Sequence, residues 1–271
     1  MTLKGAIDTH VHSGPDVRAR KTTSYELVRA AREAGMRAIV LKNHHCSTAP
    51  LAAALTEAVP GIVVRGGLVL NRAAGGWNVE AVEAALKMGA AEIWMPTLSA
   101  ENERAFRGFP GSGMRALDQE GRLLPEIIEI IRLIAKAGAV LGTGHLSPEE
   151  TCAVVACARQ EGVRSILVTH PEINFIAMPL ETQRRLLGPG LYFERCFCRP
   201  GFHRDWAGIA RDIRAAGVES TILATDLGQP DNPHPVEGLE QFVARIRSEG
   251  FSAAEIERMT VVNPAVALGL E

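Results

Sequence analysis

The sequence predicts a (β/α)8 barrel, and three observations carry that prediction. Short runs rich in apolar and β-branched residues alternate with longer segments of helical periodicity. Eight runs have the length of a strand, and each intervening helical segment is long enough to connect parallel strands. The length of 271 residues also suits a barrel, which takes about 250 residues. We therefore predict a single domain over residues 1–271.

The predicted strands and helices follow one another regularly. The strands cover residues 6–10, 38–42, 62–70, 92–96, 139–144, 165–170, 191–195 and 221–226. The helices lie near residues 22–35, 49–58, 78–88, 125–137, 148–161, 180–187, 203–216 and 236–249. Because strands alternate with helices, we expect a parallel sheet that is covered on both faces.

Local signals support these helix boundaries. Ser147 followed by Pro148 and two glutamates is typical of a helix start, with a capping side chain, a proline in the first turn and acids near the positive end of the helix dipole. Five of the predicted helices end at glycines, which favour the left-handed conformation of a helix terminus. These glycines are residues 35, 89, 138, 162 and 217.

One segment departs from the repeat. Residues 99–124 are rich in glycine, proline and charge, and they include a short hairpin that turns at residues 119–121. We expect an excursion after the fourth strand, at the C-terminal end of the barrel. It serves there either as a substrate loop or as a packing or oligomer contact.

Composition and charge exclude several classes of protein. Apolar residues make up 46% and charged residues 22% of the chain, which is typical of a globular protein. Lys plus Arg number 29 against 31 Asp plus Glu, so there is no basic field for nucleic acid or an anionic membrane. No segment approaches the ~20 apolar residues of a membrane span. Five cysteines without a CxxC pair argue against disulfides, and we assign them no function.

These features set the expected surroundings of the protein. We expect a cytoplasmic protein with a small-molecule substrate and with no nucleic-acid or membrane partner. A homodimer is the default assembly for a symmetric oligomer.

Histidines gather where the predicted strands end. His10 and His12 lie at the end of the first strand, His145 and His170 at the ends of the fifth and sixth, and Asp226 at the end of the eighth. Residues two apart on a strand share a face, and all strands of a barrel end around one opening. The sequence therefore predicts a site for a divalent metal, most simply zinc, with one ion or two.

The expected chemistry follows from that metal. A bound divalent ion lowers the pKa of water from about 15.7 to about 7, which supplies hydroxide at neutral pH. We expect hydroxide to attack a carbonyl or phosphoryl group while Asp226 carries its proton to the leaving group. His170 is either a metal ligand or a group that stabilises the developing oxyanion.

Arginines on the expected loops indicate an anionic substrate. They fall after the first, third and seventh predicted strands, near the same opening, and are Arg18, Arg20, Arg72 and Arg199. They suit a carboxylate or phosphate on a small substrate, although arginines on loops are often simply solvated.

The sequence resembles a known superfamily at these residues. The motifs DTHVH, GHLS, THPE and ATDLG, with NPAVALGL near the end, resemble the amidohydrolase superfamily of metal-dependent hydrolases over essentially the whole chain, and are most similar to an uncharacterised group of small single-domain barrels. The resemblance implies a (β/α)8 barrel that hydrolyses an amide, ester or lactone. It implies His10 and His12 as metal ligands, and Asp226 as ligand and proton shuttle. It also implies His145 and His170 as ligands, or as one ligand and one catalytic group.

A second resemblance ranks behind it. DTHVHSGPD followed by AREAGMRAIVLKNHH is similar to the opening of the polymerase-and-histidinol-phosphatase phosphoesterases, which would make His44 a metal ligand. Three departures weaken it: Asn43 replaces an aspartate, no glutamate follows the third strand, and Gly228 stands where a histidine is expected. A non-hydrolytic barrel, such as a decarboxylase or a binding protein, is the third alternative.

The amidohydrolase resemblance leaves one gap. Two-metal members of the superfamily bridge their ions with a carboxylated lysine or a glutamate, usually from the fourth strand, and the predicted fourth strand ends without either. Lys42 on the second strand and Glu194 on the seventh are the available candidates. Each of them could instead form a structural ion pair.

Overall fold

The structure, a computed structural model, describes residues 3–197 and 205–270. Its centre is one sheet of eight strands in sequential order, with every neighbouring pair parallel. The strands are β1 (Ile7–Val11), β2 (Ala38–Leu41), β3 (Val63–Val69), β4 (Glu92–Trp94), β5 (Val140–Gly142), β6 (Ile166–Thr169), β7 (Leu191–Cys196) and β8 (Thr221–Ala224). Each predicted strand overlaps one of them, with β1 and β7 ending one residue beyond the predicted range, and the barrel prediction is confirmed.

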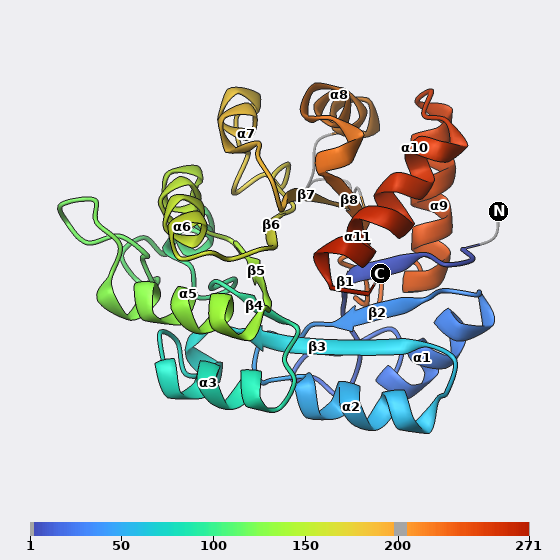
Figure 1. Ribbon diagram of the computed structural model, residues 1–271, viewed down its shortest axis with the longest axis horizontal. Helices are drawn as coiled ribbons and strands as arrows, with labels where there is room; N and C mark the ends of the chain where they lie inside the picture. Colours follow the sequence, from blue (N-terminus) through green and yellow to red (C-terminus); the bar gives the residue numbers. More distant parts are fainter. Residues whose placement is uncertain (1–2, 198–204, 271) are drawn as a thin grey trace.

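Helices surround the sheet on its outside (Figure 1). They are α1 (Ser24–Glu33), α2 (Ala49–Ala58), α3 (Val79–Lys87), α4 (Glu101–Phe106), α5 (Pro125–Ala137), α6 (Pro148–Gln160), α7 (Leu180–Leu186), α8 (Trp206–Ala216), α9 (Pro235–Ser248), α10 (Ala253–Glu257) and α11 (Asn263–Ala267). The described residues also contain two short 3₁₀ helices and one π-helical turn. These are η1 (Arg72–Ala74), η2 (Val218–Ser220) and η3 (Arg258–Val262). None of the described helices combines the length and apolarity needed to cross a membrane.

The helix boundaries form as their sequences predict. Ser147 accepts a hydrogen bond from the Glu150 amide and Glu150 reaches back to the Ser147 amide, which is a complete capping box before α6. Gly138 ends α5 in the left-handed conformation, with φ of 66°. Four isoleucines of α5 are buried on one face, and this face packs onto the barrel: Ile127, Ile130, Ile131 and Ile134.

Hydrogen bonds between β1 and the end of β8 close the barrel. The Asp226 amide donates to the His10 carbonyl, and the His12 amide donates to the Leu227 carbonyl, each at 2.8 Å. These bonds join residues that are 216 and 215 positions apart in the chain. Closure is therefore what places the first-strand histidines beside Asp226.

The C-terminal segment covers the N-terminal end of the barrel, where the strands begin. Leu268, just after α11, packs against the buried residues Ile7, Ala38 and Val40 of β1 and β2. Helix α11 accordingly lies beside β1 (Figure 1). The barrel is thus filled at its N-terminal end and leaves its C-terminal end for a site.

The segment at residues 99–124 leaves the barrel between β4 and α5. It contains α4 and a tight turn in which the Asp118 amide donates to the Arg122 carbonyl at 2.8 Å. Leu117 and Leu123 pair in antiparallel fashion on either side of that turn. The segment reaches back over the C-terminal end of the barrel through α4.

Candidate metal centre and substrate cavity

A cluster of possible metal ligands lies where β1 meets β8. His10 Nε2 and His12 Nε2 are each 3.1 Å from Asp226 Oδ1, and all three side chains are buried. One ligand atom from each lies within 4.8 Å of the other two, close enough for a single ion to bind all three. Two imidazoles and a carboxylate are ligands that zinc accepts.

The other nitrogens of these two rings already have partners. His12 Nδ1 is 2.9 Å from the Lys42 carbonyl oxygen, which can only accept, so Nδ1 carries the proton. His10 Nδ1 lies 3.0 Å from Glu194 Oε2 in the same way. Both neutral rings then direct a lone pair at the Asp226 carboxylate. Such an arrangement of acceptors repels itself unless a cation lies between them, so the donor set fits a divalent metal ion.

The two histidines differ in their affinity for protons. Burial lowers the pKa of His12 to about 3, although a hydrogen bond to the Asp226 carboxylate acts to raise it, and the Arg20 guanidinium 3.4 Å away lowers it further. Burial and the Lys42 charge also lower the pKa of His10, but the Asp226 and Glu194 carboxylates outweigh them and raise it overall. A metal ion needs both rings in the neutral form, and His12 loses its proton more readily than His10.

Lys42 and Glu194 contact opposite nitrogens of the His10 ring. Lys42 Nζ is 3.1 Å from Nε2, on the side of Asp226, and burial lowers the pKa of this lysine. Glu194 binds Nδ1 and accepts a hydrogen bond from the Thr9 hydroxyl at 2.6 Å. Glu194, Cys196 and His10 form a second group of possible ligands, but it uses the ring nitrogen that faces away from Asp226. The geometry of Glu194 is that of a residue that orients His10.

His145 and His170 face the same space from the ends of β5 and β6. Their ring centroids are 4.8 Å apart, and His170 lies 5.8 Å from His10. Burial lowers the pKa of both imidazoles. Within the described residues, neither joins His10, His12 and Asp226 in a cluster tight enough for one ion. The predicted histidines thus form two groups around one opening.

Glu103 of α4 is a site residue that the sequence does not reveal. Its Oε2 lies 2.5 Å from His145 Nδ1, and Arg107 donates to its other oxygen at 2.6 Å. Burial alone would raise the pKa of Glu103, but the His145 and Arg107 contacts lower it to about 2. In the sequence, Glu103 and Arg107 look like an ordinary surface pair four residues apart on a helix. Only the position of α4 over the barrel gives them a role.

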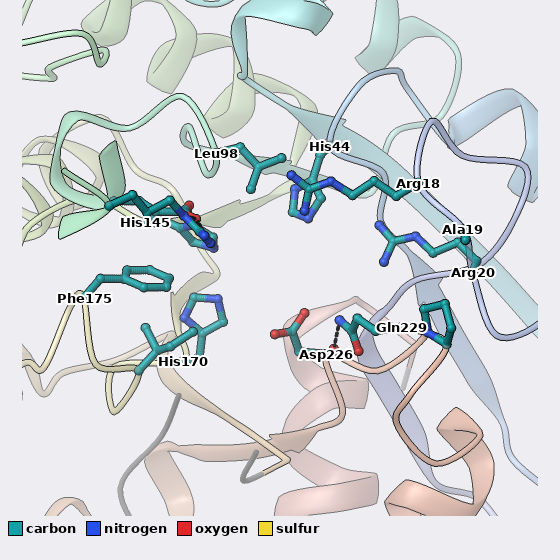
Figure 2. A pocket seen from close by; sticks show the side chains of 14 residues that line it. Arg18, Ala19, Arg20, His44, Leu98, His145, His170, Phe175, Asp226 and Gln229 are labelled. Atoms are coloured by element: carbon teal, nitrogen blue, oxygen red, sulfur yellow. Dashed lines mark hydrogen bonds and ion pairs between the residues drawn. The ribbon is translucent and has the colours of Figure 1, made fainter. Parts of the chain in front are cut away.

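A cavity of about 430 Å³ opens above these histidines (Figure 2). Its charged and polar lining includes Arg18, Arg20, His44, Glu103, Arg107, His145, His170, Asp226 and Gln229. Leu98, Ile173 and Phe175 supply apolar surface. In Figure 2, Phe175 and His170 lie across the cavity from Arg18 and Arg20. The cavity is of the size that holds a small molecule.

The four arginines selected from the sequence lie in different places. Arg18 and Arg20 line the cavity, as does Arg107, which the sequence analysis did not select. Arg72 does not line it; its Nη1 donates to the Ser112 carbonyl at 2.6 Å on the outside of the 99–124 segment. Arg199 lies outside the described residues.

The backbone departs from common conformations at the site. His170 and Asp226 have φ of 27° and 51°, in the left-handed region that costs non-glycine residues roughly 1–2 kcal/mol. Gly228, with φ of 133°, lies so close to β1 that a Cβ atom would be 2.0 Å from the His12 carbonyl oxygen. The turn after β8 therefore needs glycine here, and a histidine at position 228 has no room.

Comparison of the sequence with protein families gives one match. Residues 5–194 match DUF6282, a family of unknown function. The chain belongs to this family. No curated protein matches the DUF6282 chain.

Solved structures show how widely the fold of this DUF6282 chain is shared. An amidohydrolase from Pseudomonas aeruginosa superposes with a TM-score of 0.69 at 11% identity, covering 98% of this chain and 95% of its own. An amidohydrolase from Burkholderia multivorans gives 0.62 at 14% identity, covering 98% and 99%. A 2,6-dihydroxybenzoate decarboxylase gives 0.58 at 11% identity and covers both chains completely. The resemblance to the amidohydrolase superfamily is confirmed at the level of the fold.

Proposed function

We propose that this protein is a metal-dependent hydrolase that acts on an amide, ester or lactone carbonyl of a small anionic substrate. The observation that carries the proposal is the cluster of His10, His12 and Asp226, in which both histidines have their Nδ1 atoms bound elsewhere and aim Nε2 at one point. A group of acceptors that is buried and convergent in this way suits a cation and has no packing role.

The residues around that point have different roles in the proposed hydrolysis. A divalent ion held there supplies an acidified water molecule and polarises the carbonyl group under attack. Asp226 accepts the proton of the attacking water and passes it to the leaving group, which its position at the cavity wall allows. Glu194 and the Lys42 carbonyl hold the two histidines in the required tautomer.

We infer that the substrate is anionic from the arginines that line the cavity. Arg18 and Arg20 line one side of the cavity, and Arg107 also contributes to its wall. The Arg20 and Arg107 charges are partly balanced by Asp16 and Glu103, at 2.6 and 2.5 Å. Of these three arginines, Arg18 therefore has the positive charge that is least balanced by a neighbouring carboxylate. We propose that Arg18 binds the carboxylate of the substrate.

Phosphoester hydrolysis of the polymerase-and-histidinol-phosphatase type fits less well. It needs His44 as a metal ligand, yet among the described residues His44 belongs to neither group of possible ligands. It also needs a histidine at position 228, where the His12 carbonyl leaves no space for a side chain. Decarboxylation has no such geometric obstacle, so it remains the competing outcome of the assay.

The test combines metal analysis with a substrate screen. Purified protein is loaded with zinc, manganese or cobalt, and bound metal per chain is counted by mass spectrometry. The loaded protein is then assayed against lactones, acylated amino acids, p-nitrophenyl phosphates and aromatic carboxylates, with CO2 release recorded for the last class.

We expect at least one tightly bound ion per chain and turnover of a carbonyl substrate that bears a carboxylate. Two ions per chain would assign His145 and His170 to the second ion, and one ion would leave them to contact substrate. Failure of the protein to bind metal would sink the proposal. CO2 release without hydrolysis would replace it with the decarboxylase alternative.

A further inference from the structure

His44 is the buried cavity histidine that the proposed hydrolysis does not use. It follows β2, its ring centroid is 4.8 Å from that of His12, and it is 8% exposed. Figure 2 shows its ring directed into the cavity beside Arg18. The question is which of its two nitrogens carries a hydrogen atom, because a nitrogen that bears hydrogen cannot bind a metal ion.

Asn71 holds the neighbouring Thr97 in one orientation. Asn71 Oδ1 accepts hydrogen bonds from the Thr97 and Ser99 amides at 2.9 and 3.0 Å. Its Nδ2 donates to Thr97 Oγ1 at 2.7 Å and to the His44 carbonyl at 3.0 Å. Backbone donors and a backbone acceptor are unambiguous, so the four contacts fix the Asn71 amide. Thr97 Oγ1 therefore accepts from Asn71.

The Thr97 hydroxyl must then donate its own hydrogen to His44. Thr97 is fully buried, and its Oγ1 lies 2.9 Å from His44 Nδ1. Among the described residues, that nitrogen is the one acceptor within reach of the hydroxyl. A buried hydroxyl hydrogen without an acceptor costs roughly 1–3 kcal/mol, so the bond runs from Thr97 to Nδ1. His44 Nδ1 is then unprotonated, and the hydrogen of the neutral ring is on Nε2.

We propose that His44 is a catalytic hydrogen-bond donor whose Nε2–H binds the substrate oxygen that becomes negatively charged during hydrolysis. The inference rests on the proposed function for the identity of that oxygen, but the tautomer stands on the Asn71–Thr97–His44 contacts alone. The ring is neutral, buried and held in place, so it stabilises negative charge without reorganisation at the moment of attack. The proposal assigns His44 to the substrate and excludes it as a metal ligand.

The first experiment determines the tautomer without metal or turnover. Protein labelled with 15N in its histidine rings is examined by NMR at neutral pH, and His44 is assigned from its loss in His44→Gln. We expect Nε2–H in the wild type and in Thr97→Ser, which keeps the hydroxyl. In Thr97→Val, of nearly the same shape, we expect the Nδ1 resonance to move, because the hydrogen bond that this nitrogen accepts is lost. An Nδ1–H ring in the wild type, or an unchanged Nδ1 resonance in Thr97→Val, overturns the assignment.

The second experiment separates a donor from a ligand. Wild type is loaded with 113Cd, and coupling between the metal and His44 Nε2 would make His44 a ligand and end the proposal. Zinc-loaded wild type, His44→Gln and His44→Leu are then titrated with inorganic phosphate as an oxyanion probe. Glutamine keeps an N–H near the Nε2 position, whereas leucine keeps only the volume.

We expect equal zinc content in the three proteins. Phosphate binding should be at least about 10-fold weaker in His44→Leu and within about threefold of wild type in His44→Gln, as for loss of a hydrogen bond to a charged group. Unchanged binding in His44→Leu, loss of zinc in both variants, or a wild type that takes up no phosphate contradicts the proposal. If zinc binds but no carbonyl substrate is hydrolysed, the proposed function fails while the tautomer result is unaffected.

Discussion

At the scale of single residues, Asp226 combines two tasks that a substitution can separate. Its Oδ1 lies 3.1 Å from Nε2 of both His10 and His12, and its side chain forms part of the cavity wall. Asparagine keeps an oxygen that can face a metal ion but cannot take up a proton. We expect Asp226→Asn to lower kcat by about 10²- to 10⁴-fold, the range of general acid–base catalysis, while most of the metal stays bound.

The measurement compares kcat and bound metal in the same preparation. Asp231→Asn, at an exposed position in the loop after β8, is the matched control and should retain both. An Asp226→Asn enzyme with full activity would show that another group moves the proton.

Lys42 presents a second residue-scale question, because its amine, unlike the Glu194 carboxylate, lies on the Nε2 side of His10. Burial lowers its pKa, which favours the neutral amine that reacts with CO2 to form a carbamate. We therefore predict that bicarbonate increases metal uptake by the wild type. Lys42→Arg, which keeps the charge but forms no carbamate, should show no such increase, with metal per chain as the readout. Equal uptake with and without bicarbonate would leave Lys42 as a plain structural cation.

At the scale of elements, α4 converts the 99–124 segment from a loop into part of the site. Its Glu103 binds His145 Nδ1 and thereby fixes which nitrogen of that ring faces the cavity. We predict that Glu103→Gln lowers kcat/KM by about 10- to 100-fold, as for other residues that orient a catalytic histidine. Glu240→Gln, an exposed change on α9, should have no effect. Similar kinetics for the two variants would reduce α4 to a packing element.

The sequence predicts the strands and the histidines at their ends, but it does not predict the position of α4. The difference has a physical reason. Buried parallel strands produce local apolar runs, and barrel closure forces the ends of such runs around one opening. His10, His12 and Asp226 follow from that rule. Glu103 does not, since α4 is short and is placed by tertiary contacts of an irregular segment. The position of His44 was predictable but its tautomer was not, because Asn71 and Thr97 come from two other strand ends.

At the scale of the whole molecule, the buried histidines tie stability to pH. Burial lowers the pKa of His12 to about 3, and it lowers those of His44, His145 and His170 as well. In the unfolded chain each titrates near 6.5. Below that pH these histidines bind protons in the unfolded chain but stay neutral in the folded protein. Folding stability therefore falls as pH decreases. Each such histidine contributes about 1.4 kcal/mol per pH unit.

Two buried carboxyls oppose this trend, and so does His10 at pH values above about 6.5, because its pKa is raised. Burial raises the pKa of Asp8 to about 6, against its hydrogen bonds with Thr225, and burial also raises the pKa of Glu92. A carboxyl with a raised pKa binds its proton more readily in the folded protein, so it adds stability as pH decreases toward its unfolded value. Because four histidines outnumber two carboxyls, we expect a net loss of folding stability as the pH decreases below about 6.

The prediction is a free energy of unfolding that decreases between pH 7 and pH 5 in metal-free protein. Urea denaturation followed by circular dichroism at pH 7, 6 and 5 measures it. His170→Gln removes one of the four groups without adding charge, so its pH slope should be shallower than that of the wild type by about 1.4 kcal/mol per pH unit. Zinc should steepen the wild-type slope, because protons compete with the ion for His10 and His12. If the free energy of unfolding instead rises toward pH 5, the buried histidines are protonated in the folded protein. Protonated imidazoles cannot bind a metal ion, so that result would contradict a site of neutral histidines.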